Sequence, residues 1–342
     1  MKICICTKSF YPNIGGIENF VFLLAREFSR FKHKVTVVTD TKIKNKDIYP
    51  FEVLQIKSFL KKINIFKKQD IILCNNFSFK VLPAAMLSSA KIFIAHHTAY
   101  HKNGISFFSK EFILSYIKTR LCFFFRNIAV SKFVSNSLPG NSKVILNMYN
   151  NYIIKKIKIK KKKDFIFCGR LINEKGTDLL LDAFFKILKK NKKSYLTIVG
   201  DGPEYNNLRK KTFDLGIEKN IEFTGSLTGK ALNQKLNEHF CMIIPSQYNE
   251  PFGIVALEGL ATAQFVISSN KGGLPEAIKK CGKLIEPSIK NLFFSMSNFL
   301  KYKKFIKKDK INEHARNCKL QLLDHRCSNV AKKYINFFND SE

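Results

Sequence analysis

The sequence has no Trp, no C-x-x-C pair and no run of about 18 apolar residues. The last absence argues against a membrane-spanning helix, which needs about 20 predominantly apolar residues. The nine cysteines are odd in number and scattered, so a disulfide framework or a structural zinc site is not expected, and a reducing cytoplasm fits best. The opening residues, MKICICTKSFYP, have too short an apolar run for a signal peptide.

Acidic residues are also scarce. There are 26 Asp and Glu against 59 Lys and Arg, which gives a formal net charge of +33 at pH 7. Such a surface attracts nucleic acid, anionic lipid or phosphorylated substrates, and the total alone does not choose among them. A genome that favours Lys, Ile and Asn would produce the same total. The content of 45% hydrophobic and 13% aromatic residues nevertheless excludes a mainly disordered chain.

Strand and helix patterns alternate along both halves of the 342 residues, which predicts an α/β fold with parallel sheets and two domains. The expected strands of the first half are 2–7, 34–40, 51–56, 70–76, 91–97, 127–130 and 143–147. Those of the second half are 164–170, 195–202, 221–225, 241–246, 265–270 and 282–287. Residues 155–163 contain seven lysines and are predicted to be a solvated linker. The predicted domains are therefore 1–154 and 164–325, with a last helix at 326–342 that would cross back to the first domain.

The segment PSQYNEPFGIVALEG, residues 245–259, has seven residues between Glu250 and Glu258. Pro251 and Phe252 favour the start of a helix, so we expect Glu250 in the loop after a strand and Glu258 about two turns into the helix. Taken singly, either Glu would be a capping or a solvated residue. Together, the two carboxylates are predicted to approach one pocket. The helix start also offers free backbone N–H groups to a phosphate, those of Phe252, Gly253, Ile254 and Val255.

This segment resembles the nucleotide-sugar glycosyltransferases of family 4, whose GT-B architecture consists of two facing Rossmann-like domains with parallel sheets and an interdomain cleft. The resemblance implies that Glu250 lies beside the transferred sugar, that Glu258 binds the ribose hydroxyls of the donor, and that the anomeric configuration is retained. It also implies that the first domain binds the acceptor and the second binds the donor. The chain contains no D-x-D motif, so no metal and no other cofactor is expected.

A second match is CGRLINEKG, residues 168–176, which follows a predicted strand and precedes a predicted helix. In the family, this segment brings an Arg and a Lys to the donor diphosphate, here Arg170 and Lys175, with Gly169 beside them. Negative charge grows on the leaving nucleoside diphosphate as the glycosidic bond breaks, and the two cations would stabilise it. Outside this motif, either residue would be assigned to the solvated surface.

Two segments of the first half also match the family. Gly15 and Gly16 correspond to a G-G-x-E loop over the donor phosphates, although any loop glycine pair permits a tight turn. At the end of strand 91–97, the resemblance implies that His96 contacts the donor sugar, with His97 as the alternative. The spacing of His97 and His101 would also fit a metal site, which is the weaker interpretation because no acidic or thiol partner completes a ligand set.

Glycine turns of the second half complete the resemblance. NKGGLPEAI, with Gly272 and Gly273, resembles a G-G-x-P-E loop beside the donor, and VGDGPE, with Gly202, matches a turn that borders the nucleotide base. Either segment would equally be only a well-formed turn.

Residues 105–126 combine apolar side chains with a basic group of four, Lys110, Lys118, Arg120 and Arg126. A helix of this composition can lie in an anionic membrane surface, and the segment 59–68 would extend the docking face. The alternative is a helix packed on the core with a solvated basic edge.

The sequence therefore predicts a retaining glycosyltransferase that moves a sugar from a nucleotide-sugar to a glycan or lipid-linked acceptor in cell-surface polysaccharide or lipopolysaccharide synthesis. It would be cytoplasmic and peripheral on the inner face of the membrane. The alternatives are another GT-B-like enzyme, such as a sugar-nucleotide epimerase or a glycogen-type synthase, and a nucleic-acid-binding protein. A nucleic-acid partner is not expected, because no RNA-binding or helix-turn-helix signature accompanies the charge.

Overall fold

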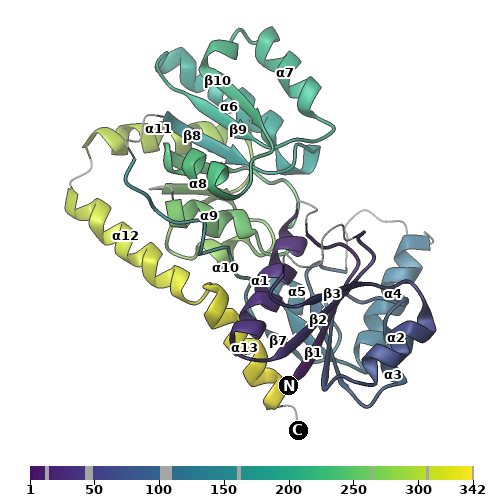
Figure 1. Ribbon diagram of the computed structural model, residues 1–342. Coiled ribbons are helices and arrows are strands. Elements are labelled where there is room, and N and C mark those ends of the chain that lie inside the picture. Colours follow the sequence, from purple (N-terminus) through teal and green to yellow (C-terminus); the bar gives the residue numbers. More distant parts are fainter. Residues whose placement is uncertain are drawn as a thin grey trace. The chain divides into compact units, whose positions relative to one another are not determined.

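The computed structural model describes residues 1–11, 15–42, 49–100, 110–159, 163–262, 265–305 and 308–340, with only the backbone at 110–112, 308, 309 and 311. The chain divides into two compact units (Figure 1). The first unit joins Met1–Asn150 to His325–Glu342, and the second is Asn151–Asp324. The boundary thus falls before the lysine-rich segment.

The first unit is built on a seven-stranded parallel sheet with the strand order β3-β2-β1-β4-β5-β6-β7. Its strands are β1 (Lys2–Thr7), β2 (Lys34–Thr39), β3 (Glu52–Gln55), β4 (Ile71–Asn75), β5 (Lys91–His96), β6 (Arg126–Ala129) and β7 (Ser142–Val144). Its helices are α1 (Gly16–Arg30), α2 (Phe59–Phe66), α3 (Leu82–Met86), α4 (Lys110–Cys122), α5 (Lys132–Ser135) and α13 (Cys327–Asn339). Every strand predicted for this half is present, because near-continuous apolar runs suit a sheet buried on both faces.

Helices cover both faces of this sheet. On one face, α1 and α13 pack over a core in which the ring centroid of Phe28 lies 6.5 Å from that of Tyr334 and 5.9 Å from that of Phe338. On the other face, Phe66 of α2 and Cys122 of α4 belong to a second core. The C-terminal helix therefore completes the first unit.

The chain leaves the first unit after Asn150 and re-enters it at His325, and these two segments are hydrogen-bonded to each other. The N–H of Tyr149 donates to the carbonyl of His325 over 3.3 Å, and Nδ1 of His325 lies 2.8 Å from the carbonyl of Asn147. The thiol of Cys327 donates to the carbonyl of Tyr149 over 3.2 Å. These bonds fix the position at which α13 begins.

The second unit is built on a six-stranded parallel sheet with the order β10-β9-β8-β11-β12-β13. Its strands are β8 (Lys163–Cys168), β9 (Leu196–Val199), β10 (Ile221–Gly225), β11 (His239–Ile244), β12 (Phe265–Ser269) and β13 (Lys283–Ile285). Its helices are α6 (Thr177–Lys190), α7 (Tyr205–Asp214), α8 (Gly229–Asn237), α9 (Ile254–Thr262), α10 (Leu274–Ile278), α11 (Ile289–Phe305) and α12 (Lys308–Leu323), with short 3-10 turns η1 (Asn173–Lys175) and η2 (Glu218–Asn220). Helices α6 and α11 share the core on one face.

Both sheets have the strand order of a Rossmann fold, in which successive strands are added on one side of the first strand and then on the other. The order switches between β1 and β4 in the first unit and between β8 and β11 in the second. Ligands of such sheets bind outside the carboxyl ends of the strands at the switch point. Each unit therefore has one place where a site is expected.

Two local predictions were wrong. Helix α9 begins at Ile254 instead of Pro251, because Gly253 has a φ of +92°, outside the helical range. Strand β11 begins at His239, two residues before the strand expected at 241–246. In the lysine-rich segment, residues 155–158 are exposed, and the N–H groups of Lys155 and Ile157 donate to Asn233 and Asn237 of α8.

Candidate functional site

The loops that follow β8 and β11 meet at the switch point of the second unit. The β8 loop carries Arg170 and Lys175, and the β11 loop carries Glu250. The N–H of Gln247 donates to the carbonyl of Glu174 over 2.8 Å, so the two loops are hydrogen-bonded. Two segments that lie far apart in the sequence thus form one surface.

The carboxylate of Glu250 is the centre of this surface. The residue is 5% exposed, and its Oε1 lies 2.5 Å from Nζ of Lys175 and accepts a hydrogen bond of 2.7 Å from Ser246. Its Oε2 accepts a hydrogen bond of 2.7 Å from the hydroxyl of Tyr248. Charge-assisted bonds of this length hold a carboxylate in one orientation.

Tyr248 contacts both members of the ion pair. The ammonium of Lys175 lies 5.1 Å from the centre of its ring and 3.4 Å from its hydroxyl. Burial and the charge of Glu250 raise the pKa of the Tyr248 hydroxyl, so it remains a hydrogen-bond donor. The sequence analysis missed Tyr248 and Ser246, and their only signal was the presence of hydroxyls two and four residues before Glu250.

Glycines allow the loops to pack this closely. Gly176, with a φ of +68°, ends the β8 loop where an added Cβ would lie 2.2 Å from the carbonyl oxygen of Pro245. The loop with Gly272 and Gly273 packs on the Glu250 segment, and the N–H of Gly273 donates to the carbonyl of Glu250 over 2.7 Å. A Cβ on Gly272 would lie 2.1 Å from the same carbonyl oxygen. The G-G loop therefore supports the backbone that carries Glu250.

Glu258 lies in the second turn of α9, and its carboxyl has no hydrogen-bond partner among the described residues. Burial raises the pKa of its carboxyl from 4.5 to about 7. Burial raises the pKa of the Cys168 thiol at the end of β8, and the nearby charge of Glu258 raises it further. The charge of Lys175 acts in the opposite direction. The segment that follows β11 thus carries one paired carboxyl, that of Glu250, and one unpaired carboxyl, that of Glu258.

The other predicted site residues of this unit differ in their exposure and in the element that carries them. Arg170 is exposed and makes no side-chain hydrogen bond or ion pair with a described residue, so its guanidinium is free for an anion. Gly169 and Gly202 lie in the turns after β8 and β9. Phe252 is 1% exposed and belongs to the interior, so its side chain is not available to a ligand. Ile254 and Val255 are the first residues of α9.

Residues 150–317 match the family model described as glycosyl transferases group 1. This match coincides almost completely with the second unit. An uncharacterised glycosyltransferase of Methanocaldococcus jannaschii is 38% identical over 117 residues, which cover 34% of this chain and 30% of that protein. The alpha-monoglucosyldiacylglycerol synthase of Streptococcus pneumoniae is 24% identical over 319 residues, 78% of this chain and 71% of that protein.

The solved structure of Anabaena HepE in complex with UDP-glucose superposes with a TM-score of 0.82 at 17% identity, covering 99% of this chain and 100% of that one. The chain therefore has the GT-B fold, with one Rossmann-like sheet in each unit, as the sequence predicted. The chain is a glycosyltransferase, and the prediction of that enzyme class is confirmed.

In the first unit of this glycosyltransferase, the structure does not support His96 as the histidine that meets a sugar. His96 is fully buried, with Nδ1 2.9 Å from the hydroxyl of Tyr100 and Nε2 2.8 Å from Oδ1 of Asn127. Burial lowers its pKa to about 4, so it is neutral. Both nitrogens are engaged in holding the strand ends, which leaves His97 as the candidate.

The predicted glycine pair lies at the start of α1. Gly15 is the N-cap and Gly16 the first helical residue, and the carbonyl of Gly15 accepts the N–H of Asn19 over 3.2 Å. A Cβ on Gly15 would lie 2.1 Å from Oε2 of Glu18, so the side chain of Glu18 folds back over the helix start. His101 lies outside the described residues, so the prediction that no metal binds at these histidines stays untested.

The basic residues of the predicted membrane face differ in their surroundings. Lys118 lies 5.9 Å from the ring centre of Phe79, and Nε of Arg120 donates to the hydroxyl of Tyr116 over 3.1 Å. Arg126 is not on α4: it begins β6, with its guanidinium 5.6 Å from the ring centre of a core residue, Phe93. The side chain of Lys110 lies outside the described ones.

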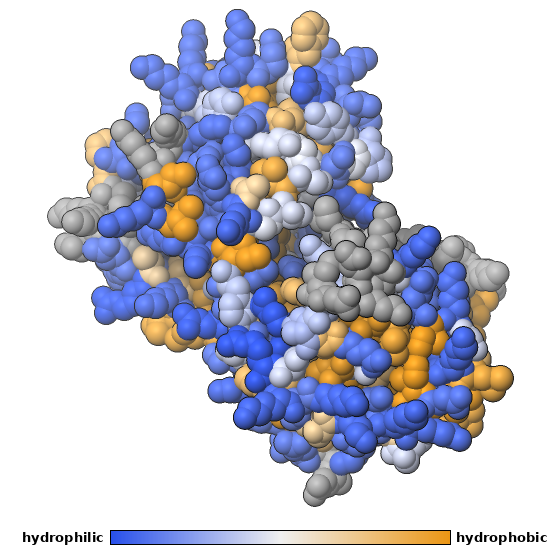
Figure 2. Space-filling model, in the orientation of Figure 1, coloured by the Kyte–Doolittle hydropathy of each residue, from blue (hydrophilic) through white to orange (hydrophobic). Residues whose placement is uncertain are grey.

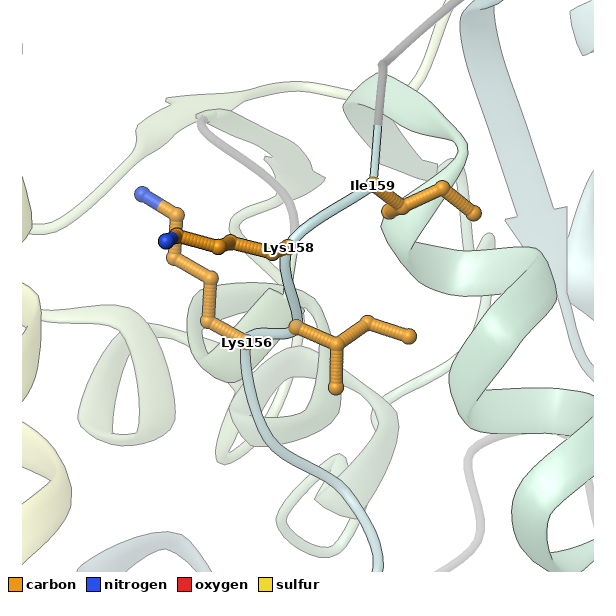
Figure 3. Close-up of a pocket in the computed structure, with 4 residues that line it drawn as sticks. Lys156, Lys158 and Ile159 are labelled. Atoms are coloured by element: carbon orange, nitrogen blue, oxygen red, sulfur yellow. The ribbon is translucent and has the colours of Figure 1, made fainter.

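A hollow of about 640 Å³ lies against the lysine-rich segment before β8 (Figure 3). The residues that line it are Lys156, Ile157, Lys158 and Ile159. None of them is a predicted site residue, and we assign no role to it.

Proposed function

We propose that this glycosyltransferase moves a sugar from a nucleotide-sugar donor to an acceptor with retention of anomeric configuration, and that the second unit binds the donor. The observation that carries the proposal is the Lys175–Glu250 ion pair at the switch point of this unit, with the unpaired cation of Arg170 on the same loop. A UDP-glucose complex of a protein with this fold supports a nucleotide-sugar donor.

Each polar group of the site has a role in this proposal. Arg170 and Lys175 bind the diphosphate and stabilise the charge that develops as it leaves. Glu258, whose carboxyl has no partner among the described residues, accepts hydrogen bonds from the ribose hydroxyls. Glu250 faces the transferred sugar, and a departing diphosphate oxygen assists removal of the proton from the acceptor hydroxyl on the same face. The backbone N–H groups of Ile254 and Val255, at the start of α9, meet a phosphate.

The first test is a thermal-shift screen against UDP, GDP and ADP, followed by assays of diphosphate release from the matching nucleotide-sugars. A bound nucleotide raises Tm in proportion to the logarithm of its concentration over Kd. One base should stabilise the protein more than the others, and Glu258→Ala should abolish that stabilisation. No stabilisation by any of the three would contradict the proposal.

We propose that the reaction needs no metal, because the chain has no D-x-D motif and its own cations can neutralise the diphosphate. Activity is expected to be unchanged in excess EDTA, measured as diphosphate release. A complete loss that added Mg²⁺ restores would refute this part of the mechanism.

We further propose that the acceptor is a glycan or a lipid-linked sugar of cell-surface synthesis, reached by peripheral docking of the first unit on the anionic inner face of the membrane. The name of the Streptococcus pneumoniae relative supports a lipid acceptor. Among the described helices, none is both long and apolar enough to cross a membrane. Large apolar side chains are instead exposed at the surface of α2, α3 and α4, among them Phe59, Leu60, Met86, Leu87, Ile113, Ile117, Phe123 and Phe124.

Lys118 and Arg120 contact the exposed rings of Phe79 and Tyr116 in this region, and Figure 2 shows hydrophobic and hydrophilic groups side by side on this unit. The protein should co-sediment with phosphatidylglycerol vesicles, and a Lys118→Gln, Arg120→Gln variant should bind them more weakly in low salt. Raising the salt should release the wild type, because exposed charges are screened beyond about 8 Å at physiological ionic strength. A matched Lys192→Gln, Lys193→Gln variant of the second unit should bind as wild type does. Equal binding by both variants would show that these two cations do not dock the protein.

A further inference from the structure

The Glu250 carboxylate has partners on both of its oxygens. Oε1 contacts the Lys175 ammonium over 2.5 Å and the Ser246 hydroxyl over 2.7 Å. Among the described residues, Oε2 has one hydrogen bond, which the Tyr248 hydroxyl donates over 2.7 Å. The last torsion of a Glu side chain has no sharp preference of its own, so bonds to both oxygens are needed to fix the plane of the carboxylate.

These partners come from two different loops. Ser246 and Tyr248 lie with Glu250 in the loop after β11, whereas Lys175 ends η1 in the loop after β8. The two hydroxyls therefore belong to the same segment as the carboxylate, while the ammonium reaches it from another segment. A change in the position of the ammonium weakens the ion pair and leaves both hydroxyl contacts in place.

Donor binding makes a competing demand on Lys175. The ammonium carries a single positive charge, and in the proposed function it also binds the diphosphate. The diphosphate and the Glu250 carboxylate are both anions, so they share this cation and repel each other. The ion pair is therefore weakest when the donor is bound, which is when Glu250 has to face the sugar.

Tyr248 is suited to hold Glu250 in that state. Its hydroxyl is neutral, and burial together with the charge of Glu250 raises its pKa, so it stays protonated and able to donate. Nζ of Lys175 lies 3.4 Å from the same hydroxyl and 5.1 Å from the centre of the ring. The Tyr248 side chain thus contacts both groups of the ion pair that the diphosphate would weaken.

We propose that Tyr248 is a positioning residue of the transfer reaction: its hydroxyl holds the Glu250 carboxylate in the orientation that faces the sugar while the Lys175 ammonium is shared with the diphosphate. Tyr248 acts through Glu250 and not on the substrate. This inference rests on the proposed function. It makes the hydroxyl, and not the ring, the part of Tyr248 that turnover requires.

The test is Tyr248→Phe, which keeps the ring beside Lys175 and removes the hydroxyl. The kcat for diphosphate release at saturating donor should fall roughly 10- to 100-fold, because a small misplacement of an orienting group has an effect of this order. The Kd of the free nucleoside diphosphate chosen by the thermal-shift screen should stay as in wild type, since Lys175 and Arg170 are intact.

Tyr195→Phe is the matched control. The Tyr195 ring also lies beside an ammonium, 4.5 Å from Nζ of Lys163, but it does so at the amino ends of β8 and β9, away from the switch point. The kcat of this variant should equal that of wild type. An equal loss in the control, or a wild-type kcat in Tyr248→Phe, would overturn the inference.

A double variant shows whether the hydroxyl acts through Glu250. In a Glu250→Gln background, Tyr248→Phe should lower kcat by no more than about twofold, because the carboxylate that it positions is already gone. The same loss in both backgrounds would mean that Tyr248 acts independently of Glu250 and would overturn the inference. If the wild type releases no diphosphate from any nucleotide-sugar, the proposed function fails, and this inference with it.

Discussion

Lys175→Ala is expected to turn over its donor about 100- to 1,000-fold more slowly than wild type, the usual effect of removing one preorganised group that stabilises developing charge. The ammonium lies 2.5 Å from Oε1 of Glu250 and above the ring of Tyr248, so its loss removes a charge partner of the diphosphate and the group that orients Glu250. The measurement is kcat for diphosphate release at saturating donor.

A double-mutant cycle distinguishes this role from a general loss of charge. If the function of Lys175 depends on its pairing with Glu250, the kcat of the double variant Lys175→Ala, Glu250→Gln should be only slightly lower than that of the slower single variant. Lys211→Ala is the matched control, because Lys211 pairs with Asp182 over 2.8 Å elsewhere in the same unit. Multiplicative losses in the double variant, or an equal loss in the control, would contradict the coupled role.

The free energy of unfolding should fall as the pH rises from about 4.5 to about 7, and ionisation of Glu258 should contribute to this fall. The Glu258→Gln variant should lack that contribution. Burial raises the pKa of this carboxyl to about 7 in the folded protein, whereas the unfolded chain has its ordinary value of 4.5. The folded state therefore binds more protons between these values, and the unfolded state gains stability as the pH rises. Above pH 7 both states are ionised and the penalty is complete, at most about 3 kcal/mol.

The measurement is the Tm of wild type and of Glu258→Gln from pH 5 to pH 8. The variant should gain stability relative to wild type as the pH rises through this window. Nucleotide affinity of the wild type should rise over the same range, because the ionised carboxylate is the better acceptor for ribose hydroxyls. Parallel Tm curves for the two proteins would mean that the Glu258 carboxyl is not desolvated in the folded state.

The sequence predicted the strands well because apolar runs in a doubly covered sheet are distinctive. The resemblance to family 4 also implied that the Arg170–Lys175 and Glu250–Glu258 segments would share the donor site. The Lys175–Glu250 ion pair itself was not predictable, because it depends on how Gly176 packs against the carbonyl of Pro245.

The two adjacent histidines illustrate what sequence could not decide. Neighbouring residues at a strand end point to opposite faces, so His96 and His97 had to differ, but the pattern does not say how. The partner of His96 is Asn127, 31 residues away, whose position depends on how β6 pairs with β5. The tertiary structure therefore reverses the order of preference between the two.

The most direct test of the account is diphosphate release from UDP-, GDP- and ADP-sugars by the wild type and by Glu250→Gln, with binding of the same nucleotides measured in parallel. The account predicts that the wild type cleaves sugars of one base only, and that Glu250→Gln binds that nucleotide normally but releases diphosphate at least 100-fold more slowly. Equal release by the two proteins, or release from none of the donors, would contradict it.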